Sequence, residues 1–361
     1  MMAGYETVRE LRGNLPPIRC SCCNRLLYRG VAQTIEIKCP KCGKVQTVKG
    51  LETERLHLAG NYTGRLSRAD NIYSASRVVT DSAGRIVALP NRPQRVIALN
   101  ASNLGLYYAT GGEVVARTAT SLLPPELKEK VKAVPTVGLP LSPDVAGIIA
   151  IKPDLVLGMH APMHHSVAAA LEQNGIPVLL QALEDYTDVL KTLRLYGELS
   201  GNPAQADKKI EAIENKRKEL LQRHYGKIPP KVLILWHNAN GIYTALSNSF
   251  VGNLVKRLGG VNVADLAAAI GENLHYTPFC LDAITMFQPD IILIGSHSFA
   301  TNNGRSSAEF LDAQPKWQRL TAVQRNAVYR LPFHLFAVNP GPQLEDALTV
   351  LADFLYERRA L

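Results

Sequence analysis

The chain has 361 residues, of which 46% are hydrophobic and 20% are charged. This composition is typical of a globular protein and excludes disordered and collagen-like chains. The longest apolar runs, such as residues 145–151, are far shorter than the roughly 20 residues that cross a bilayer, which excludes membrane insertion. The net charge is +9, and residues 1–75 hold most of the excess, with 12 basic against 6 acidic residues. Only this N-terminal part therefore favours an acidic partner.

Five of the six cysteines lie close together near the N-terminus. Four of them form two CxxC pairs separated by 15 residues, Cys20 with Cys23 and Cys39 with Cys42. Each CxxC turn directs two thiolates toward one ion, so this spacing predicts a tetrahedral zinc site with these four ligands. Cys22 could replace Cys23, although the two-residue spacing favours Cys23. Residues 26–28 and 34–37 are expected to form short strands, which completes a zinc ribbon within residues 1–50.

The segments IRCSCCNRLL and IEIKCPKCGK around these pairs resemble the Com family of small zinc-binding proteins from Mu-like prophages. The resemblance covers about residues 15–48 and implies a module that binds messenger RNA and regulates its translation. The charge and one stacking surface for such binding would come from Arg19, Arg25, Tyr28, Arg29, Lys38, Lys41 and Lys44. A ribbon that is only structural, or that binds a protein, is the alternative, because one aromatic side chain supplies little stacking for RNA.

Residues 51–75 are polar and aperiodic, so we interpret them as a linker. Two β-rich runs then flank the turn at Asp81–Gly84, a pattern that predicts a hairpin. Short apolar segments predict further strands at residues 95–99, 114–117, 155–159, 177–180, 231–236, 242–245, 291–295 and 327–331. Residues 186–224 are charged and lack strands, and Pro203 near the start of a periodic stretch predicts a helix over 202–223. This alternation of strands and helices predicts an α/β fold with mostly parallel sheets.

The segments VVTDSAGRIVALPNRPQRVIALN, IIAIKPDLVLG, NGIPVLL and LDAITMFQPDIILIGS resemble the helical-backbone class (class III) of substrate-binding proteins of ABC importers. The resemblance implies two Rossmann-like lobes, residues 76–185 and 227–361, joined by one long helix within a connecting segment, residues 186–226. It implies an iron–siderophore, haem, vitamin B12 or related metal species as the ligand. Chelatases and nitrogenase-type proteins share the two-lobed fold, so the fold alone leaves the function open.

In open α/β sheets a ligand binds beyond the carboxyl ends of the strands, which predicts a site in the cleft between the lobes. Six of the nine histidines follow predicted strands, three in each lobe, and imidazole is a common ligand of borderline transition metals. The residues predicted to bind the ligand are Asn103, His160, Met163, His164, His165, Trp236, His237, Tyr243, His297, Phe333 and His334. The aromatic residues among them would line an apolar ring pocket, or simply pack in the core.

This set favours a haem, a corrinoid, an iron chelate or a small nickel, cobalt or zinc species. Anionic siderophores rank lower, because Arg305 is the nearest candidate for an arginine at the cleft. Cys280 could be a further soft ligand at the rim, but burial is the interpretation that we favour.

Proteins of the resembled class contact their permease through one acidic residue on each lobe. The matching position in lobe 2 is Asp282, whereas in lobe 1 it is Ala146, with Asp144 nearby. The N-terminal sequence lacks the apolar segment of a secretory signal, and four reduced thiolates suit the cytosol. These observations predict a cytoplasmic location, with the periplasm or the cell surface as the alternative if the true start lies upstream.

The sequence therefore predicts a binding protein rather than an enzyme. The function that we favour is a cytoplasmic carrier or sensor of a metal-containing small molecule, whose ribbon links occupancy to an RNA or protein partner. A conventional importer component that delivers the same ligand to an ABC permease is the alternative. A tetrapyrrole chelatase is a third reading, although the sequence contains no P-loop, nucleophile elbow or GxGxxG motif after a strand.

Overall fold

The computed structural model describes residues 17–19, 26–29, 34–38, 45–49, 76–238, 241–266, 275–296, 311–337 and 339–357. The chain divides into two compact units, Met1–Ser67 and Arg68–Leu361. None of the helices in these described ranges is long and apolar enough to cross a membrane.

The N-terminal unit contains two antiparallel strand pairs in its described residues. β1 (Pro17–Arg19) pairs with β2 (Leu26–Arg29), and β3 (Thr34–Lys38) pairs with β4 (Val45–Lys49). β2 and β3 coincide with the two strands expected from the sequence, which confirms them. The predicted zinc ligands fall outside the described residues and stay a prediction, namely Cys20, Cys23, Cys39 and Cys42.

The larger unit begins with an antiparallel hairpin that is fixed to the edge of the first sheet. β5 (Ser76–Thr80) and β6 (Ile86–Pro90) flank the turn at Asp81–Gly84, which confirms the predicted hairpin. The buried Asp81 carboxylate accepts hydrogen bonds from the Arg85 guanidinium at 2.6 Å and from the backbone N–H of Leu180 at 3.2 Å. The hairpin is therefore anchored by a satisfied buried charge rather than by apolar packing alone.

Lobe 1 is built on a parallel sheet in the order β12-β11-β7-β8. Its strands are β7 (Val96–Ala98), β8 (Ala116–Arg117), β11 (Leu155–Met159) and β12 (Val178–Gln181). Each coincides with a strand predicted from the sequence. Because successive residues of a strand face opposite sides, Leu157 and Val156 of β11 belong to two different hydrophobic clusters, one on each face. The other elements are α1 (Ala101–Ala109), α2 (Pro125–Lys130), the hairpin β9 (Gly138–Leu139) and β10 (Ser142–Pro143), α3 (Val145–Ile151), α4 (Pro162–Glu172) and α5 (Tyr186–Ser200).

Lobe 2 contains a six-stranded sheet in the order β16-β14-β13-β17-β18, with β15 also paired to β13. Its strands are β13 (Lys231–Asn238), β14 (Gly241–Ala245), β15 (Val261–Asn262), β16 (Tyr276–Pro278), β17 (Ile291–Ser296) and β18 (Val328–Arg330). β14 is antiparallel to both of its neighbours, whereas β13 pairs in parallel with β15 and β17. The prediction of mostly parallel sheets is thus confirmed. The helical elements are α7 (Phe250–Arg257), η1 (Val263–Leu266), α8 (Leu281–Phe287), α10 (Pro315–Gln318), α11 (Thr321–Gln324), α12 (Phe333–Phe336), η2 (Gly341–Gln343), α13 (Leu344–Ala352) and the π-helical turn η3 (Asp353–Glu357).

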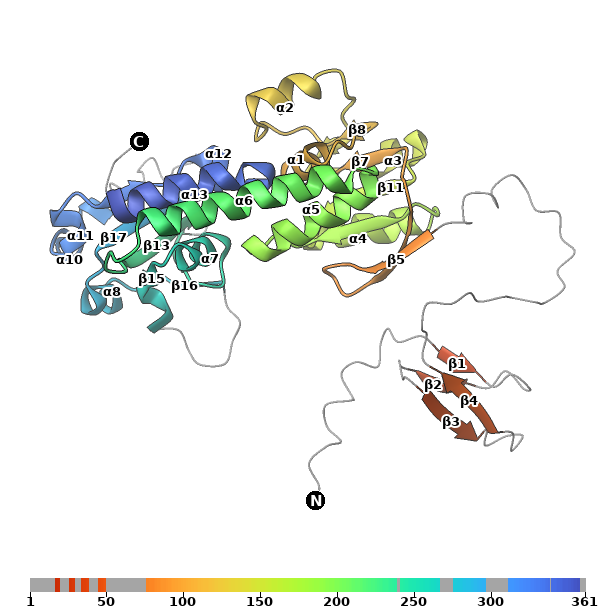
Figure 1. The fold of residues 1–361 in the computed structure, drawn as a ribbon, viewed down its shortest axis with the longest axis horizontal. Coiled ribbons are helices and arrows are strands. Elements are labelled where there is room, and N and C mark those ends of the chain that lie inside the picture. Colours follow the sequence, from red (N-terminus) through yellow and green to blue (C-terminus); the bar gives the residue numbers. More distant parts are fainter. Residues whose placement is uncertain are drawn as a thin grey trace, which may run out of the picture. The chain divides into compact units, whose positions relative to one another are not determined.

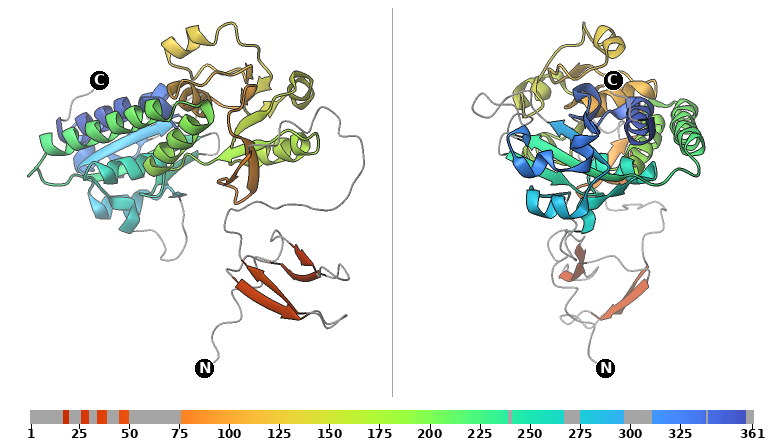
Figure 2. Two further views of the ribbon diagram at one scale, coloured as in Figure 1. Left: turned by 45° about the vertical axis from the view of Figure 1, so that its right-hand side comes forward. Right: turned by 90° about the vertical axis from the view of Figure 1, so that its left-hand side faces the viewer.

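The long helix α6 (Pro203–Arg223) joins the two lobes, as the sequence predicts. Pro203 occupies its first turn, where a missing backbone N–H costs nothing. The helix packs against α5 in lobe 1 and against α13 in lobe 2, and Figure 1 shows it running along both lobes. Both views of Figure 2 show α6 and α13 side by side. One rigid element therefore spans the larger unit.

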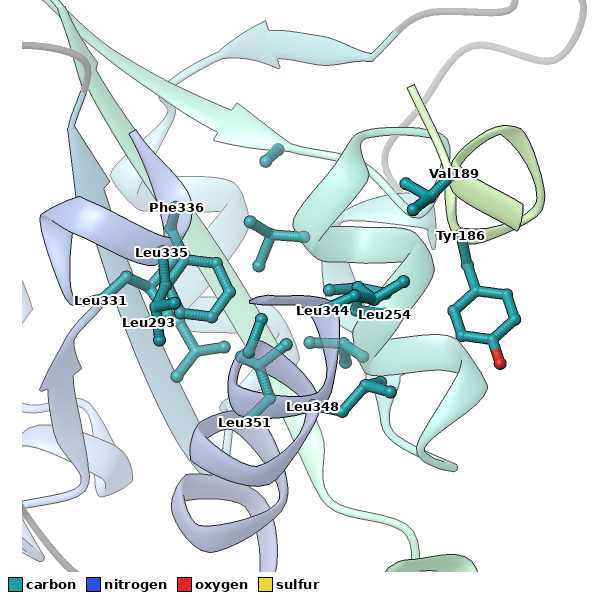
Figure 3. Packing of buried hydrophobic residues seen from close by; sticks show 14 of the residues in the cluster. Tyr186, Val189, Leu254, Leu293, Leu331, Leu335, Phe336, Leu344, Leu348 and Leu351 are labelled. Atoms are coloured by element: carbon teal, nitrogen blue, oxygen red, sulfur yellow. The ribbon is translucent and has the colours of Figure 1, made fainter. Parts of the chain in front are cut away.

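One hydrophobic cluster continues from lobe 1 into lobe 2. It contains Leu104 of α1 as well as Leu235 of β13 and Leu348 of α13. Figure 3 shows part of this cluster: Val189 of α5 lies beside Leu254 of α7, which lies beside the leucines of α13. Separating the lobes would expose this apolar surface to water, at roughly 25 cal/mol for each Å². The shared core therefore opposes wide opening.

Candidate functional site

The strand order of each sheet locates the place where a ligand is expected. In lobe 1 the chain passes from β7 to β8 on one side and later to β11 on the other, so the order reverses between β7 and β11. In lobe 2 it passes from β13 to β14 and β15, and later to β17 on the opposite side. Ligands of open α/β sheets bind beyond the carboxyl ends of the strands at such reversals. The residues there are Asn100 and His160 in lobe 1 and His237 and Ser296 in lobe 2.

Asn339, which follows α12, connects lobe 2 to lobe 1 by hydrogen bonds. Its Nδ2 donates a hydrogen bond to the carbonyl of Leu183 at 2.9 Å, and its own carbonyl accepts one from Oγ of Ser102 at 2.6 Å. Its Oδ1 accepts a hydrogen bond from the backbone N–H of Gly341 at 2.8 Å. Ser102 and Leu183 belong to lobe 1, so these bonds join the lobes. We call this group of four residues the interlobe clasp.

The clasp escaped the sequence analysis. Its local signal is the segment Asn339–Pro342 (NPGP), which indicates a turn but not the partner of that turn. A second contact between the lobes was also missed: Nε2 of His275 lies 3.6 Å from a carboxylate oxygen of Glu184.

Two exposed histidines face each other at the carboxyl end of β11. Nε2 of His165 lies 3.1 Å from Nδ1 of His160, and the ring centroids are 4.8 Å apart with an interplanar angle of 54°. The backbone N–H of His160 donates to the carbonyl of Gln181 at 3.0 Å, and that of His165 donates to the carbonyl of Ala161 at 3.1 Å. Strand β12 and the first turn of α4 thus hold the pair in place. We call His160 and His165 the histidine pair.

His164 precedes His165 in the sequence, but its side chain is buried in the core of lobe 1. Its Nδ1 accepts a hydrogen bond from the backbone N–H of Met159 at 2.8 Å, so its Nε2 carries the proton and donates to the carbonyl of Pro140 at 2.8 Å. Burial lowers the pKa of this ring because the charged form loses hydration. His164 can therefore reach a ligand only by giving up two hydrogen bonds. Met163, the residue before it, is half-buried on α4.

Asn103 is fully buried and is also engaged by the protein. Its Nδ2 donates to the carbonyl of Gly158 at 2.8 Å, and its Oδ1 accepts from the hydroxyl of Tyr196 at 2.9 Å. Burial raises the pKa of Tyr196 well above its usual value, which keeps this hydroxyl protonated as a donor. Asn103 thus links α1, β11 and α5 beneath the predicted site.

Lobe 2 contributes residues from neighbouring strands. Trp236 is buried on β13, and its ring leaves no space for a side chain at Gly295 of β17, since a Cβ there would lie 2.2 Å away. Tyr243, which is opposite Trp236 in the β13–β14 register, is half-buried. His237 is 8% exposed at the end of β13, beside Ser296 in the register with β17. Trp236 and Tyr243 therefore share one face of the lobe 2 sheet, whereas His237, the next residue of β13, points to the opposite face at the carboxyl end of the strand.

Two further predicted residues belong to α12. His334 is exposed and Phe333 is half-buried. His297 and Arg305 fall outside the described residues, so their predicted roles stay predictions. Within the described residues, no group of three or more His, Cys, Asp and Glu side chains could hold a metal ion.

The predicted docking residues lie at the starts of two helices. Asp282 is exposed in the first turn of α8 and forms an ion pair with Lys316. In lobe 1, Asp144 is the N-cap of α3 and accepts from the backbone N–H of Gly147 at 3.0 Å, while Ala146 is exposed. Cys280 is exposed rather than buried, because it precedes α8 at the surface, and our favoured interpretation of it was wrong.

Residues 96–335 match the family model described as periplasmic binding protein, and the chain therefore belongs to that family. Residues 14–55 match a second model, described as Mu-like prophage protein Com. A similar protein is the uncharacterized ABC transporter substrate-binding lipoprotein YvrC of Bacillus subtilis, 25% identical over 286 residues that cover 77% of this chain and 85% of the relative. The high-affinity heme uptake system protein IsdE of Staphylococcus aureus is 25% identical over 233 residues, which cover 64% and 77%.

Solved structures of the same kind confirm the two-lobed fold. An ABC transporter substrate-binding protein from Listeria monocytogenes has a TM-score of 0.64 and 21% identity, covering 74% of this chain and 99% of that one. IsdE of S. aureus complexed with heme has a TM-score of 0.62 and 22% identity, covering 73% and 98%. The catecholate-siderophore binding protein VctP of Vibrio cholerae has a TM-score of 0.63 and 18% identity, covering 78% and 99%.

Proposed function

We propose that this protein binds a metal-containing small molecule between the carboxyl edges of its two lobes and delivers it to an ABC permease. The histidine pair carries this proposal, because it places two exposed imidazoles at the strand-order reversal of lobe 1. Haem, corrinoids, iron chelates and nickel or cobalt species are the candidate ligands. The names of relatives support this class: IsdE is a heme uptake protein, and VctP binds a catecholate siderophore.

Both lobes contribute to the proposed site. Lobe 1 offers the histidine pair, and lobe 2 offers His237 near the carboxyl end of β13. Since α6, the shared core and the interlobe clasp all link the lobes, closure around a ligand would be a small rocking motion. In this proposal the exposed Asp282 marks the permease-facing end of lobe 2.

Titration of the full chain with haem and with ferric citrate, followed by absorption and by fluorescence of its two tryptophans, tests the proposal. We expect one of these complexes to bind with a stoichiometry of one. His237→Ala should weaken that binding at least tenfold, whereas Gln173→Ala, an exposed site at the end of α4, should leave it unchanged. The proposal fails if both complexes, and also a nickel complex, leave the spectra unchanged at micromolar concentrations.

A cytoplasmic carrier is a second candidate function, and the N-terminal cysteines favour it. Four thiolates bound to zinc suit a reducing compartment, and Ala146 replaces an acidic docking residue in lobe 1. In this version the ribbon would connect ligand occupancy to an RNA or protein partner. Fractionation of the native host distinguishes the two: protein in the cytosol supports the carrier, whereas protein in the envelope supports the importer component.

A further inference from the structure

The spacing of the histidine pair matches the spacing of two neighbouring ligands on one metal ion. Imidazole nitrogens bind transition metals at about 2.1 Å, so two adjacent ligands lie about 3.0 Å apart in an octahedron and about 3.4 Å apart in a tetrahedron. Two ligands on opposite sides of a metal lie about 4.2 Å apart. The facing nitrogens of His160 and His165 are separated by 3.1 Å, which falls in the range of adjacent ligands.

The facing nitrogens are also available for a metal. Both rings are exposed, so the small rotation that turns two lone pairs toward one point requires no repacking. A neutral imidazole can carry its proton on either nitrogen, so both facing nitrogens can offer lone pairs at once without losing a proton. His164 shows the contrast, because both of its ring nitrogens hydrogen-bond to backbone groups.

The backbone brings the two rings together without help from a metal. His160 is held by the carbonyl of Gln181 on β12, and His165 lies in the first turns of α4, which begins at Pro162. The separation of the Cα atoms is thus set by strand pairing and by helix geometry. A metal would exchange one hydrogen bond between the rings for two coordination bonds.

We infer that the histidine pair is a two-nitrogen chelate, and that the ligand is a borderline transition-metal complex with two adjacent open coordination positions. This inference rests on the proposed function and narrows its substrate class. A nickel, cobalt or copper ion held by a non-planar chelator with four donor atoms fits, because such a chelator leaves two adjacent positions open. Haem offers its two open positions on opposite faces, so it cannot accept both imidazoles together. A chelator with six donor atoms leaves no open coordination position on the metal.

Two nickel complexes test the inference, because they differ in open positions. Nickel–nitrilotriacetate has four chelator donors and two adjacent open positions, whereas nickel–EDTA has six donors and none. Calorimetric titration of the zinc-saturated full chain should show one site for nickel–nitrilotriacetate and none for nickel–EDTA. His160→Ala and His165→Ala should each weaken binding at least tenfold, and Gln173→Ala, an exposed polar side chain at the C-cap of α4, should not. The N-terminal cysteines are the same in all variants, so differences in affinity between the variants measure the contribution of the histidine pair.

Three results would overturn the inference. They are equal affinity in the wild type and the double alanine variant, retention of full affinity in either single variant, and binding of nickel–EDTA that depends on the pair. Its failure is distinguishable from failure of the proposed function. If ferric citrate or haem binds while nickel–nitrilotriacetate does not, the inference falls and the proposed function stands. If nickel–nitrilotriacetate binds through the pair but His237→Ala has no effect on any metal complex, the chelate stands and the interlobe site falls.

Discussion

Removing the side chain of Asn339 should loosen the connection between the lobes. Asn339→Ala deletes the bond that its Nδ2 donates to the carbonyl of Leu183 and the bond that its Oδ1 accepts from Gly341. The bond from Ser102 ends on the backbone carbonyl and remains. At about 1 kcal/mol for each intramolecular hydrogen bond, the free energy of unfolding should fall by about 2 kcal/mol. Since unfolding entropy is about 2.1 cal/mol/K per residue, the melting temperature of the larger unit should fall by about 3 °C.

Two measurements check this expectation. Calorimetry gives the change in melting temperature, and hydrogen exchange at the Gly341 amide, which donates to Asn339, should become at least tenfold faster. The matched control is Asn174→Ala, which removes one exposed bond to Ala170 within lobe 1 and should cost about 0.5 kcal/mol or less. The reasoning is refuted if the two variants melt together and the Gly341 amide exchanges at its original rate.

Three further changes have calculable outcomes. Asp81→Ala removes a buried carboxylate that accepts hydrogen bonds from a guanidinium and from several backbone N–H groups. Urea unfolding should therefore show a decrease of about 3–5 kcal/mol in the free energy of unfolding. A decrease below about 1 kcal/mol would contradict the anchoring of the hairpin by Asp81. Gly252→Ala would place a Cβ 2.0 Å from the carbonyl oxygen of Leu246, so the melting temperature should fall clearly, and an unchanged value would argue against the packing of α7. Burial lowers the pKa of His164, so the unfolded chain binds more protons than the folded chain, and the free energy of unfolding should decrease as pH falls below about 6.5. In acid unfolding curves, His164→Gln should show a weaker dependence of stability on pH than the wild type. Parallel curves for the two proteins would contradict this expectation.

The elements of the larger unit followed from local patterns. Apolar runs bounded by turns predicted the strands, and the position of Pro203 with the spacing of apolar residues predicted α6 almost to the residue. Such signals suffice because hydrophobic periodicity reflects which face of an element is buried. The contacts of Asn339 could not be predicted in this way, because its hydrogen-bond partner Ser102 is separated from it by 237 residues.

The burial of His164 was also missed, but here the sequence contains a pattern that predicts it. Val167, Ala168 and Leu171 follow it at intervals of three, four and seven residues, and all four side chains are buried on one face of α4. A helix turns by about 100° per residue, so the next position, His165, necessarily points to a different side. Because the candidate ligands were chosen by residue type, both histidines were predicted to bind the ligand. The helical periodicity instead assigns His164 to the core and His165 to another side of the helix.

The triple connection between the lobes, through α6, the clasp and the continuous core, has a consequence for the proposed delivery to a permease. A binding protein whose lobes already have their ligand-bound arrangement loses little conformational entropy when the ligand binds, which lowers the entropic cost of association. The same stiffness means that the filled and the empty receptor have nearly the same outline. A partner that accepts only the filled form must then sense the guest itself, or the side chains around it, instead of a large change in shape.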